Sequence, residues 1–466
     1  MSPRRMLARL VPFAVAALGA GCMSLAPEYQ RPNAPVAAAY PGDATGTNRP
    51  AHDIEWQAFF ADERLRRLIA LALQNNRDLR VAAASIEQAR AQLQVRRADV
   101  YPTVNVGAAA ARQPSVVNGN ENTSYSVGLT LSTWELDFFG RLRSLNDVAL
   151  SQFYAAEESR KATQISLIAA VASAHLAIQA DDELLETTRE TLATREDSFR
   201  LTKLKFDHGA ASELDLRQAE SLLEGARVTL AQTRRQRALD ENALVLLVGQ
   251  SLPSDLPPAL PLAQQKLLAD VPAGLPSELL DRRPDVRQAE RQLMAANANI
   301  GAARAALFPR ITLTGSAGTA SSELSGLFKS GSFATTVASQ LLLPIFDAGR
   351  NQGNLQAAQA GRDIALAQYE KAIQSAFREV ADALAGRATF GEQLRAQQAQ
   401  AAAEEVRTRL ADLRYRNGAA SYLDVLDARR SLFAARQAVV QVQLQQAQNL
   451  VTLYKVLGGG WTDPVK

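Results

Sequence analysis

A short pattern that occurs twice constrains this chain more than any other feature. Gly-Ala-Ala-Ser-x-Leu-Asp spans 209–215 and again 418–424, so the two copies are 418 − 209 = 209 residues apart. In each copy Gly ends a long helical pattern, Ser opens the next one, and Asp follows Ser by three residues. This order is typical of a helix stop followed by a capping box. The chain is therefore predicted to be a duplicated half, in which each copy forms the tip of a helical hairpin.

Proline is distributed very unevenly along the 466 residues. None lies between Pro114 and Pro253, or between Pro344 and Pro464. Because proline breaks a helix interior, very long helices can form in these two tracts. A single helix over 141–206 would be about 100 Å long at about 1.5 Å per residue. No globular core needs such a helix, so its length indicates a spacer across a compartment.

Two segments alternate apolar residues with small or polar ones, as half-buried strands do. The first hairpin is predicted within 103–133, around a polar loop at 113–122. The second lies within 311–341, around a Gly/Ser-rich loop at 318–332. Strands of roughly ten residues suit a tilted membrane strand. The small, polar face is expected to line a water-filled lumen and contains Ser126, Gly128, Thr130, Thr312 and Thr314.

The first residues have the form of a bacterial lipoprotein signal. Arg4, Arg5 and Arg9 precede a short apolar run, and small residues lead to Cys22, the only cysteine of the chain. Cys22 is predicted to be lipidated after removal of 1–21, and the alternative is a free thiol in a segment cut elsewhere. Cleavage lowers Lys+Arg from 51 to 51 − 3 = 48, which balances 48 Asp+Glu. The net charge therefore gives no argument for nucleic acid.

The predicted organisation is mainly α, with long helical hairpins and a small pair of membrane β-hairpins. Four amphipathic strands are too few to enclose a lumen, and open edges in lipid would leave backbone groups unpaired. Three copies would supply a twelve-stranded barrel above an α-helical barrel. The expected segments are a signal peptide (1–21), a lipidated tether (22–62), repeat 1 (63–250, tip 206–215), a crossover (251–275), repeat 2 (276–458, tip 415–424) and a tail (459–466).

Several motifs together resemble the outer-membrane factor family, the TolC-like channels, and in particular the NodT-type lipoproteins of resistance-nodulation-division efflux systems. They are the lipoprotein start with Pro-x-Tyr-x-x-Pro at 27–32, the Arg-Pro-Asp-Val stretch within 275–290, Leu-Phe-Pro at 307–309, the two tips and the ending at 453–461. The match covers nearly the whole mature chain. The resemblance implies a passive, homotrimeric outer-membrane channel that extends into the periplasm and exports drugs or other small toxic compounds.

The same resemblance implies partners and sites. The partners would be a periplasmic adaptor protein, an inner-membrane pump of the resistance-nodulation-division type, and outer-membrane lipid. The second tip would narrow the aperture with the gate residues Leu423, Asp424, Asp427 and Arg430. In repeat 1 the positions of Asp427 and Arg430 hold Gln218 and Ser221, so only the second tip contains this pair. The adaptor would dock on the small tip residues Gly209, Ala210, Ala211, Ser212, Gly418, Ala419, Ala420 and Ser421.

Simpler interpretations account for some of these residues. Asp215 and Asp424 are explained by helix capping alone, small residues are what a tight turn needs, and Asp427 with Arg430 could be an ordinary surface pair. No cofactor motif, metal-ligand spacing or nucleophile motif is found in the sequence, so an enzyme is not predicted. The alternatives to an efflux channel are a type I secretion conduit and a non-conducting, periplasm-spanning structural lipoprotein. No motif specifies the transported compound, the partner pump or the resting state of the aperture.

Overall fold

The computed structural model describes residues 24–37, 39–40, 54–114, 121–265, 267 and 278–461. The predicted signal peptide, Cys22 and the end of the tail lie outside these residues, as do parts of the tether and crossover. The chain divides into two compact units. One contains the described parts of Met1–Asn33, Ala84–Glu158 and Gln288–Lys371, and the other those of Ala34–Ala83, Ser159–Arg287 and Ala372–Lys466. Each unit takes segments from both repeats, so the repeats are not themselves the compact units.

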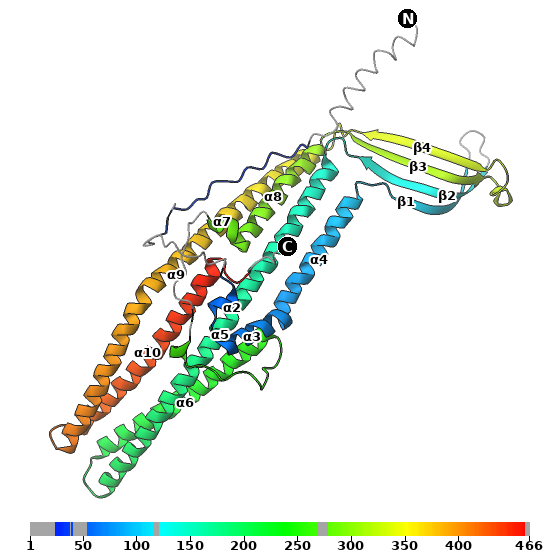
Figure 1. Cartoon of the computed structure of the whole chain (residues 1–466). Helices are drawn as coiled ribbons and strands as arrows, with labels where there is room; N and C mark the ends of the chain where they lie inside the picture. The colour runs from blue at the N-terminus through cyan, green and yellow to red at the C-terminus, as the bar shows by residue number, and fades with distance from the viewer. Residues whose placement is uncertain are drawn as a thin grey trace. The chain divides into compact units, whose positions relative to one another are not determined.

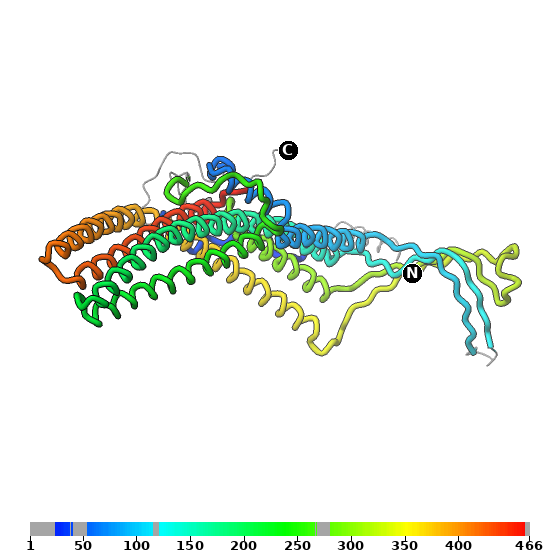
Figure 2. Tube along the Cα trace, turned by 90° about the horizontal axis from the view of Figure 1, so that it is seen from below, coloured from blue at the N-terminus to red at the C-terminus, as the bar shows by residue number. Residues whose placement is uncertain are grey.

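Long helices dominate the structure, as the proline-free tracts predict (Figure 1). The helix expected over 141–206 is confirmed as α5, Arg141–Asp207, and its repeat counterpart is α9, Arg350–Arg416; both have 67 residues. Figure 2 shows α5 and α9 each turning back into a return helix. The return helices are α6 (Glu213–Val248) and α10 (Tyr422–Val456), and the shorter helices are α2 (Trp56–Phe59), α3 (Glu63–Asn75), α4 (Arg77–Ala98), η2 (Leu262–Gln264), α7 (Glu278–Arg282), α8 (Pro284–Ala305) and η3 (Leu324–Gly326).

Four strands form one antiparallel sheet in the order β1-β2-β3-β4. They are β1 (Val104–Pro114), β2 (Glu121–Leu136), β3 (Arg310–Ser321) and β4 (Phe333–Leu342). Both hairpins are confirmed, but their predicted loops were too long: Gln113 pairs with Asn122, and Gly318 pairs with Ala334. The alternation in the sequence fades before the strands end, because small residues with low strand preference continue the backbone ladder.

Glycine lets the central strands approach closely in the middle of the sheet. Gly128 of β2 pairs with Gly318 of β3. A Cβ on Gly128 would lie 2.6 Å from the Ala317 carbonyl oxygen, and one on Gly318 would lie 2.3 Å from the Val127 carbonyl oxygen. Larger residues would push the ladder apart. The small face predicted from the sequence is therefore also a packing requirement.

The Pro-x-Tyr-x-x-Pro segment runs along α8. Arg31 donates from Nε and Nη2 to the two carboxylate oxygens of Glu290, each at 2.7 Å, and the Tyr29 hydroxyl donates to Glu290 Oε1 at 3.1 Å. Asn297 donates to the Pro27 carbonyl at 2.7 Å, and Arg304 to the Leu25 carbonyl at 3.1 Å. The N-terminal end of the described segment therefore lies near the C-terminal end of α8. Bidentate charged hydrogen bonds fix its path.

Short segments and helices pack together in the second unit. His175 is 1% exposed, and its Nε2 lies 3.1 Å from Asp62 Oδ2. The Asp62 carboxylate also accepts from Gln265 and from the backbone N–H of Arg64. Burial alone would raise the pKa of Asp62, but these hydrogen bonds hold it below its ordinary value. Phe59 stacks on Tyr454 with ring centroids 4.1 Å apart, so this core joins residues far apart in the sequence.

Replacing Asp181 by Asn is expected to stabilise the protein at pH 8. Asp181 is 6% exposed in α5, and burial together with a hydrogen bond to Asp240 raises the pKa of Asp181 to about 7. The folded protein then binds a proton that the unfolded chain releases near pH 4, so stability falls as pH rises through this window. The variant should gain about 1 kcal/mol at pH 8 and lose that gain as the pH falls toward about 4. Thermal unfolding across pH measures the difference. An equal gain at pH 4.5 and pH 8 would contradict the assignment, and Asp197→Asn on the exposed surface of α5 is the control.

Candidate functional site at the hairpin tips

Both tips have the geometry of a helix stop. Gly209 and Gly418 each adopt φ = 73°, in the left-handed region that favours glycine. At the second tip the Gly418 N–H donates to the Tyr415 carbonyl at 3.0 Å, and the Ala419 N–H to the Arg414 carbonyl at 2.8 Å. The first tip has the same two bonds, at 2.9 and 2.7 Å. This is a Schellman motif in each repeat.

The return helix at each tip begins with the predicted capping box. Ser421 Oγ accepts from the Asp424 N–H at 3.3 Å, and the Ser421 N–H donates to Asp424 Oδ2 at 3.0 Å. Ser212 and Asp215 make the equivalent pair of bonds, each at 3.1 Å. The capping interpretation of Asp215 and Asp424 is therefore confirmed. One carboxylate oxygen of Asp424, Oδ2, is therefore already hydrogen-bonded within the cap.

Asp427 is held by two arginines. Arg430 Nη2 lies 2.7 Å from Asp427 Oδ1, which is the i, i+3 pair suggested by the sequence, and Arg407 Nη2 of α9 lies 2.5 Å from Asp427 Oδ2. The hydrogen bond from Arg407, supported by the charge of Arg430, holds the pKa of Asp427 below its ordinary value. Asp427 is thus not a bare carboxylate. Its negative charge is balanced locally by these two guanidinium groups.

Arg407 was missed by the sequence analysis, although a signal for it was present. Subtracting the repeat offset gives 407 − 209 = 198, which is Ser198. Like Asp427 and Arg430, Arg407 therefore occurs only in the second repeat. Arg407 lies on the helix before the tip, whereas Asp427 and Arg430 lie on the helix after it. The three charged residues form one cluster across α9 and α10.

A groove lies beside this cluster. It has a volume of about 450 Å³ and is lined from α10 by the four gate residues and Leu426, and from α6 by Gln218, Ser221 and Leu222. Gln218 and Ser221 are the repeat equivalents of Asp427 and Arg430, so equivalent positions from the two repeats line one groove. Its charged groups come from the second repeat alone. Leu423, the apolar residue predicted to belong to the gate, is 56% exposed.

The tip residues assigned to docking differ in exposure. Six are exposed, whereas Ala211 and Ala420 are half-buried; the six are Gly209, Ala210, Ser212, Gly418, Ala419 and Ser421. The two hairpins are also linked: Lys205 Nζ donates to the Tyr415 hydroxyl at 2.8 Å, and Arg429 donates to Ser198. The tips therefore combine small exposed turns with polar contacts between the hairpins.

Comparison with known proteins gives this arrangement a context. The model of a family described as outer membrane efflux protein matches residues 68–250 and 275–459. The chain belongs to the outer membrane efflux protein family. The resemblance inferred from the motifs is confirmed, and with it the mainly α fold with a small sheet and the location in the outer membrane. Efflux, rather than enzymatic catalysis, is what the family's description states.

The relatives match over almost the full length of this efflux protein. Toluene efflux pump outer membrane protein TtgF of Pseudomonas putida is 49% identical over 456 residues, covering 95% of this chain and 94% of the relative. Outer membrane protein OprJ of Pseudomonas aeruginosa is 46% identical over 454 residues, covering 96% and 95%. The open state of the Neisseria gonorrhoeae MtrE outer membrane channel has a TM-score of 0.86 and 41% identity, covering 94% of this chain and 98% of that one.

Proposed function

We propose that this efflux protein forms a homotrimeric channel that passively exports small apolar or toxic compounds delivered by an inner-membrane pump. The observation that carries the proposal is the open sheet. Its order β1-β2-β3-β4 leaves one edge of β1 and one edge of β4 unpaired among the described residues. Three copies supply 3 × 4 = 12 strands, which close a barrel and pair every edge. The relative named as a toluene efflux pump outer membrane protein supports the substrate class.

The two faces of the sheet support a water-filled lumen. Val127, Leu129 and Leu131 lie on one face of β2, whereas Ser126, Gly128 and Thr130 lie on the other. In register, Thr130 pairs with Asn105 and Ser316, and Ser316 pairs with Thr336, so the polar face continues across all four strands. Alternation of this kind suits lipid outside and water inside.

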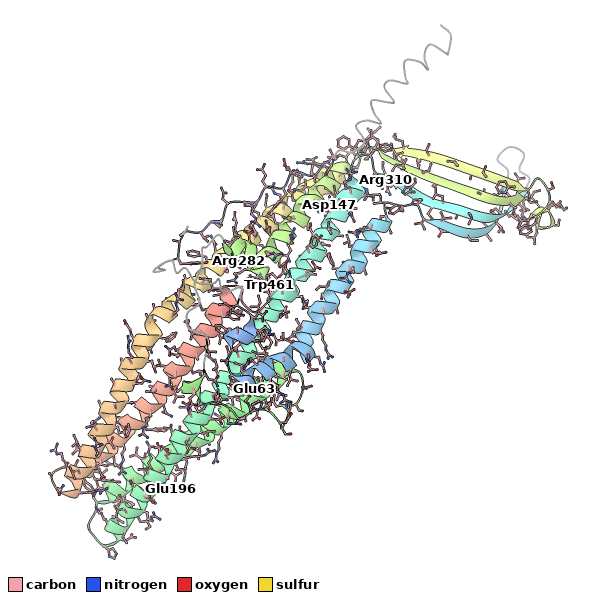
Figure 3. All side chains as sticks on the ribbon, in the orientation of Figure 1. Glu63, Asp147, Glu196, Arg282, Arg310 and Trp461 are labelled. Carbon is pink, nitrogen blue, oxygen red and sulfur yellow. The ribbon has the colours of Figure 1, made fainter. Side chains whose placement is uncertain are left out.

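Lipidation of Cys22 is part of this proposal. The Leu25 carbonyl accepts from Arg304 near the end of α8, and β3 begins only a few residues later, at Arg310 (Figure 3). The path of the described N-terminal segment therefore brings the chain toward the base of the sheet. An acyl chain on Cys22 would start at the level where a membrane strand enters lipid.

Reconstitution tests the function. Purified protein should have the mass of a trimer in detergent and should give discrete conductance steps in a planar bilayer. A trimer without conductance would favour a structural spacer. A monomer under the same conditions would contradict the proposal. Deleting the gene should sensitise cells to toluene and to antibiotics, and restoring it should reverse the effect.

Cysteines at Ala210 and Ala419 are expected to crosslink to a periplasmic adaptor in cells. Both positions are exposed at the turns, and a Cys is close to Ala in size, so the helix stops are preserved. Treatment with a thiol–amine crosslinker and blotting for a tagged adaptor would measure docking. The control is Val228→Cys, which is 56% exposed on α6 away from the turn. Equal crosslinking at position 228 and at the tips, or none at either tip, would argue against docking at the turns.

A further inference from the structure

The segment that follows β4 presents two large apolar side chains to solvent. Ile345 is 94% exposed and Phe346 is 90% exposed. The backbone around them is held in place. The strand before them pairs with β3 up to Leu342, and Asp347 accepts from the N–H groups of Gly349 and Asn351, each at 2.9 Å. Adjacent large apolar side chains on a fixed segment indicate a binding surface.

The equivalent turn in repeat 1 is covered by the chain itself. After β2, the Phe139 ring stacks on Phe308 at the junction of α8 and β3, with ring centroids 4.9 Å apart and planes at 21°. The last residues of the β2–β3 ladder are Leu136 and Ile311. This cover exists because β2 is an inner strand with β3 beside it. β4 is an edge strand, so no strand in the described part of the chain lies on its outer side.

Adding or subtracting the repeat offset gives the residues at the outer edges of β1 and β4 that correspond to these contacting residues. The stretch Leu-Phe-Pro at 307–309 corresponds to Val-Tyr-Pro at 100–102, so Phe308 becomes Tyr101, since 308 − 207 = 101. Leu136 becomes Ile345 (136 + 209), and Ile311 becomes Val104 (311 − 207). Ala348 holds the place of Phe139, and the aromatic ring of this turn is Phe346 instead. Tyr101 is 72% exposed and Val104 is 61% exposed. Within one chain, therefore, these two residues are open to solvent, as Ile345 and Phe346 are.

Strand direction brings these two pairs of residues together between copies. In the antiparallel order, β1 begins and β4 ends at the same end of the sheet. Where the β4 edge of one copy lies beside the β1 edge of the next, the segment after β4 meets the segment before β1. Such a head-to-tail contact repeats around a closed ring. Neither edge carries a lysine, and β4 has no charged residue or proline to block pairing.

We infer that Ile345 and Phe346 of each copy pack against Val104 and Tyr101 of the next copy, forming an apolar clasp that holds the assembly together at the base of the sheet. The inference rests on the proposed trimer and names the contact that closes it. The boundary differs from the one within the chain. There Arg310 pairs with Glu135 at 2.7 Å, whereas the translated positions are Thr103 and Pro344. The clasp is therefore apolar where the internal boundary has an ion pair.

Paired cysteines test the clasp in the full-length protein. Tyr101→Cys combined with Phe346→Cys should give covalent dimers and trimers with a short bifunctional thiol reagent, and either single variant should give none. The control pair is Tyr101→Cys with Val337→Cys. Val337 is 78% exposed but lies within β4, away from its end. A trimer by mass that gives no covalent ladder would overturn the clasp and leave the proposed function standing. Absence of a trimer in the unmodified protein would instead overturn the proposed function.

A second measurement tests the same contact without crosslinking, through the thermal stability of the trimer. Phe346→Ala and Tyr101→Ala should each lower the temperature at which the trimer dissociates on unheated gels, and the double variant should lower it no further than the larger single effect. Phe346→Leu should restore much of the loss, because an apolar contact does not require the ring. Phe346→Trp with fluorescence quenched by brominated lipid would place this side chain in the membrane instead. That result would overturn the clasp.

Discussion

Removing both arginines that hold Asp427 is expected to make the channel markedly more cation-selective. Asp424 and Asp427 carry two negative charges, and Arg407 and Arg430 carry two positive ones, so the four groups balance as 2 − 2 = 0. Arg407→Ala with Arg430→Ala leaves −2 in each copy, or 3 × (−2) = −6 around a trimer. Clustered carboxylates attract cations and repel one another, most strongly at low salt. The reversal potential under a KCl gradient should therefore shift several-fold toward the potassium potential.

The matched control for this variant is Arg227→Ala, which removes an exposed ion pair from α6 outside the tip groove. Its reversal potential should equal that of the unmodified channel. Asp427→Ala should shift selectivity in the opposite direction, because it removes one carboxylate and leaves both arginines, of which Arg407 also pairs with Glu404. Single-channel conductance and selectivity that stay unchanged in both tip variants would show that this cluster does not line the aperture.

If Asp427 lines the aperture, its lowered pKa predicts a defined pH dependence of ion selectivity. Arg407 and Arg430 favour the ionised carboxylate, so Asp427 stays charged to a lower pH than an ordinary aspartate. Selectivity controlled by Asp427 should then be constant from neutral pH down to about pH 5 and change only in stronger acid. In Arg407→Ala the same change should begin at a higher pH, which separates the contribution of this arginine from a general acid effect.

Replacing Arg283 by Met is expected to cause a large loss of stability in the second unit. Arg283 is 6% exposed, and its guanidinium lies 2.6 Å from Asp285 and 2.8 Å from Glu379. It also donates to the Val456 carbonyl at 3.2 Å. Because its loss leaves two carboxylates and a helix-end carbonyl without their partner, the variant should lose about 3 kcal/mol. Thermal unfolding of the purified protein measures the loss.

Two variants set the scale for Arg283. Arg283→Lys keeps the charge but loses the planar fork, so an intermediate loss is expected. Arg378→Met removes an exposed arginine whose ion pair with Asp382 is 3.9 Å long, and this change should be nearly neutral. If Arg283→Met and Arg378→Met unfold at the same temperature, Arg283 is not the connection between α8, α9 and α10 that the contacts indicate.

Elements that depend on local chemistry could be predicted from the sequence. Gly418 and Ser421 specify a helix stop and a cap within a few residues, and the proline-free tracts allow the two 67-residue helices. The family also followed from short motifs. Repeat subtraction identified Asp427 and Arg430 as residues peculiar to the second tip. These features are local in the chain, so pattern and propensity were sufficient to predict them.

Contacts between residues far apart in the chain could not be predicted in this way. Arg407 reaches Asp427 from the neighbouring helix, and Glu290 fixes Arg31 from 259 positions away. The strands also extend beyond their alternating patterns, because hydrogen bonds to a neighbouring strand satisfy the backbone of small residues whatever their propensity. The exposure of Ile345 and Phe346 after β4 also depends on a neighbouring strand, which, in the described part of the chain, their counterparts after β2 have and they lack. Exposure depends on whether another strand lies alongside, and sequence spacing within one strand does not contain that information.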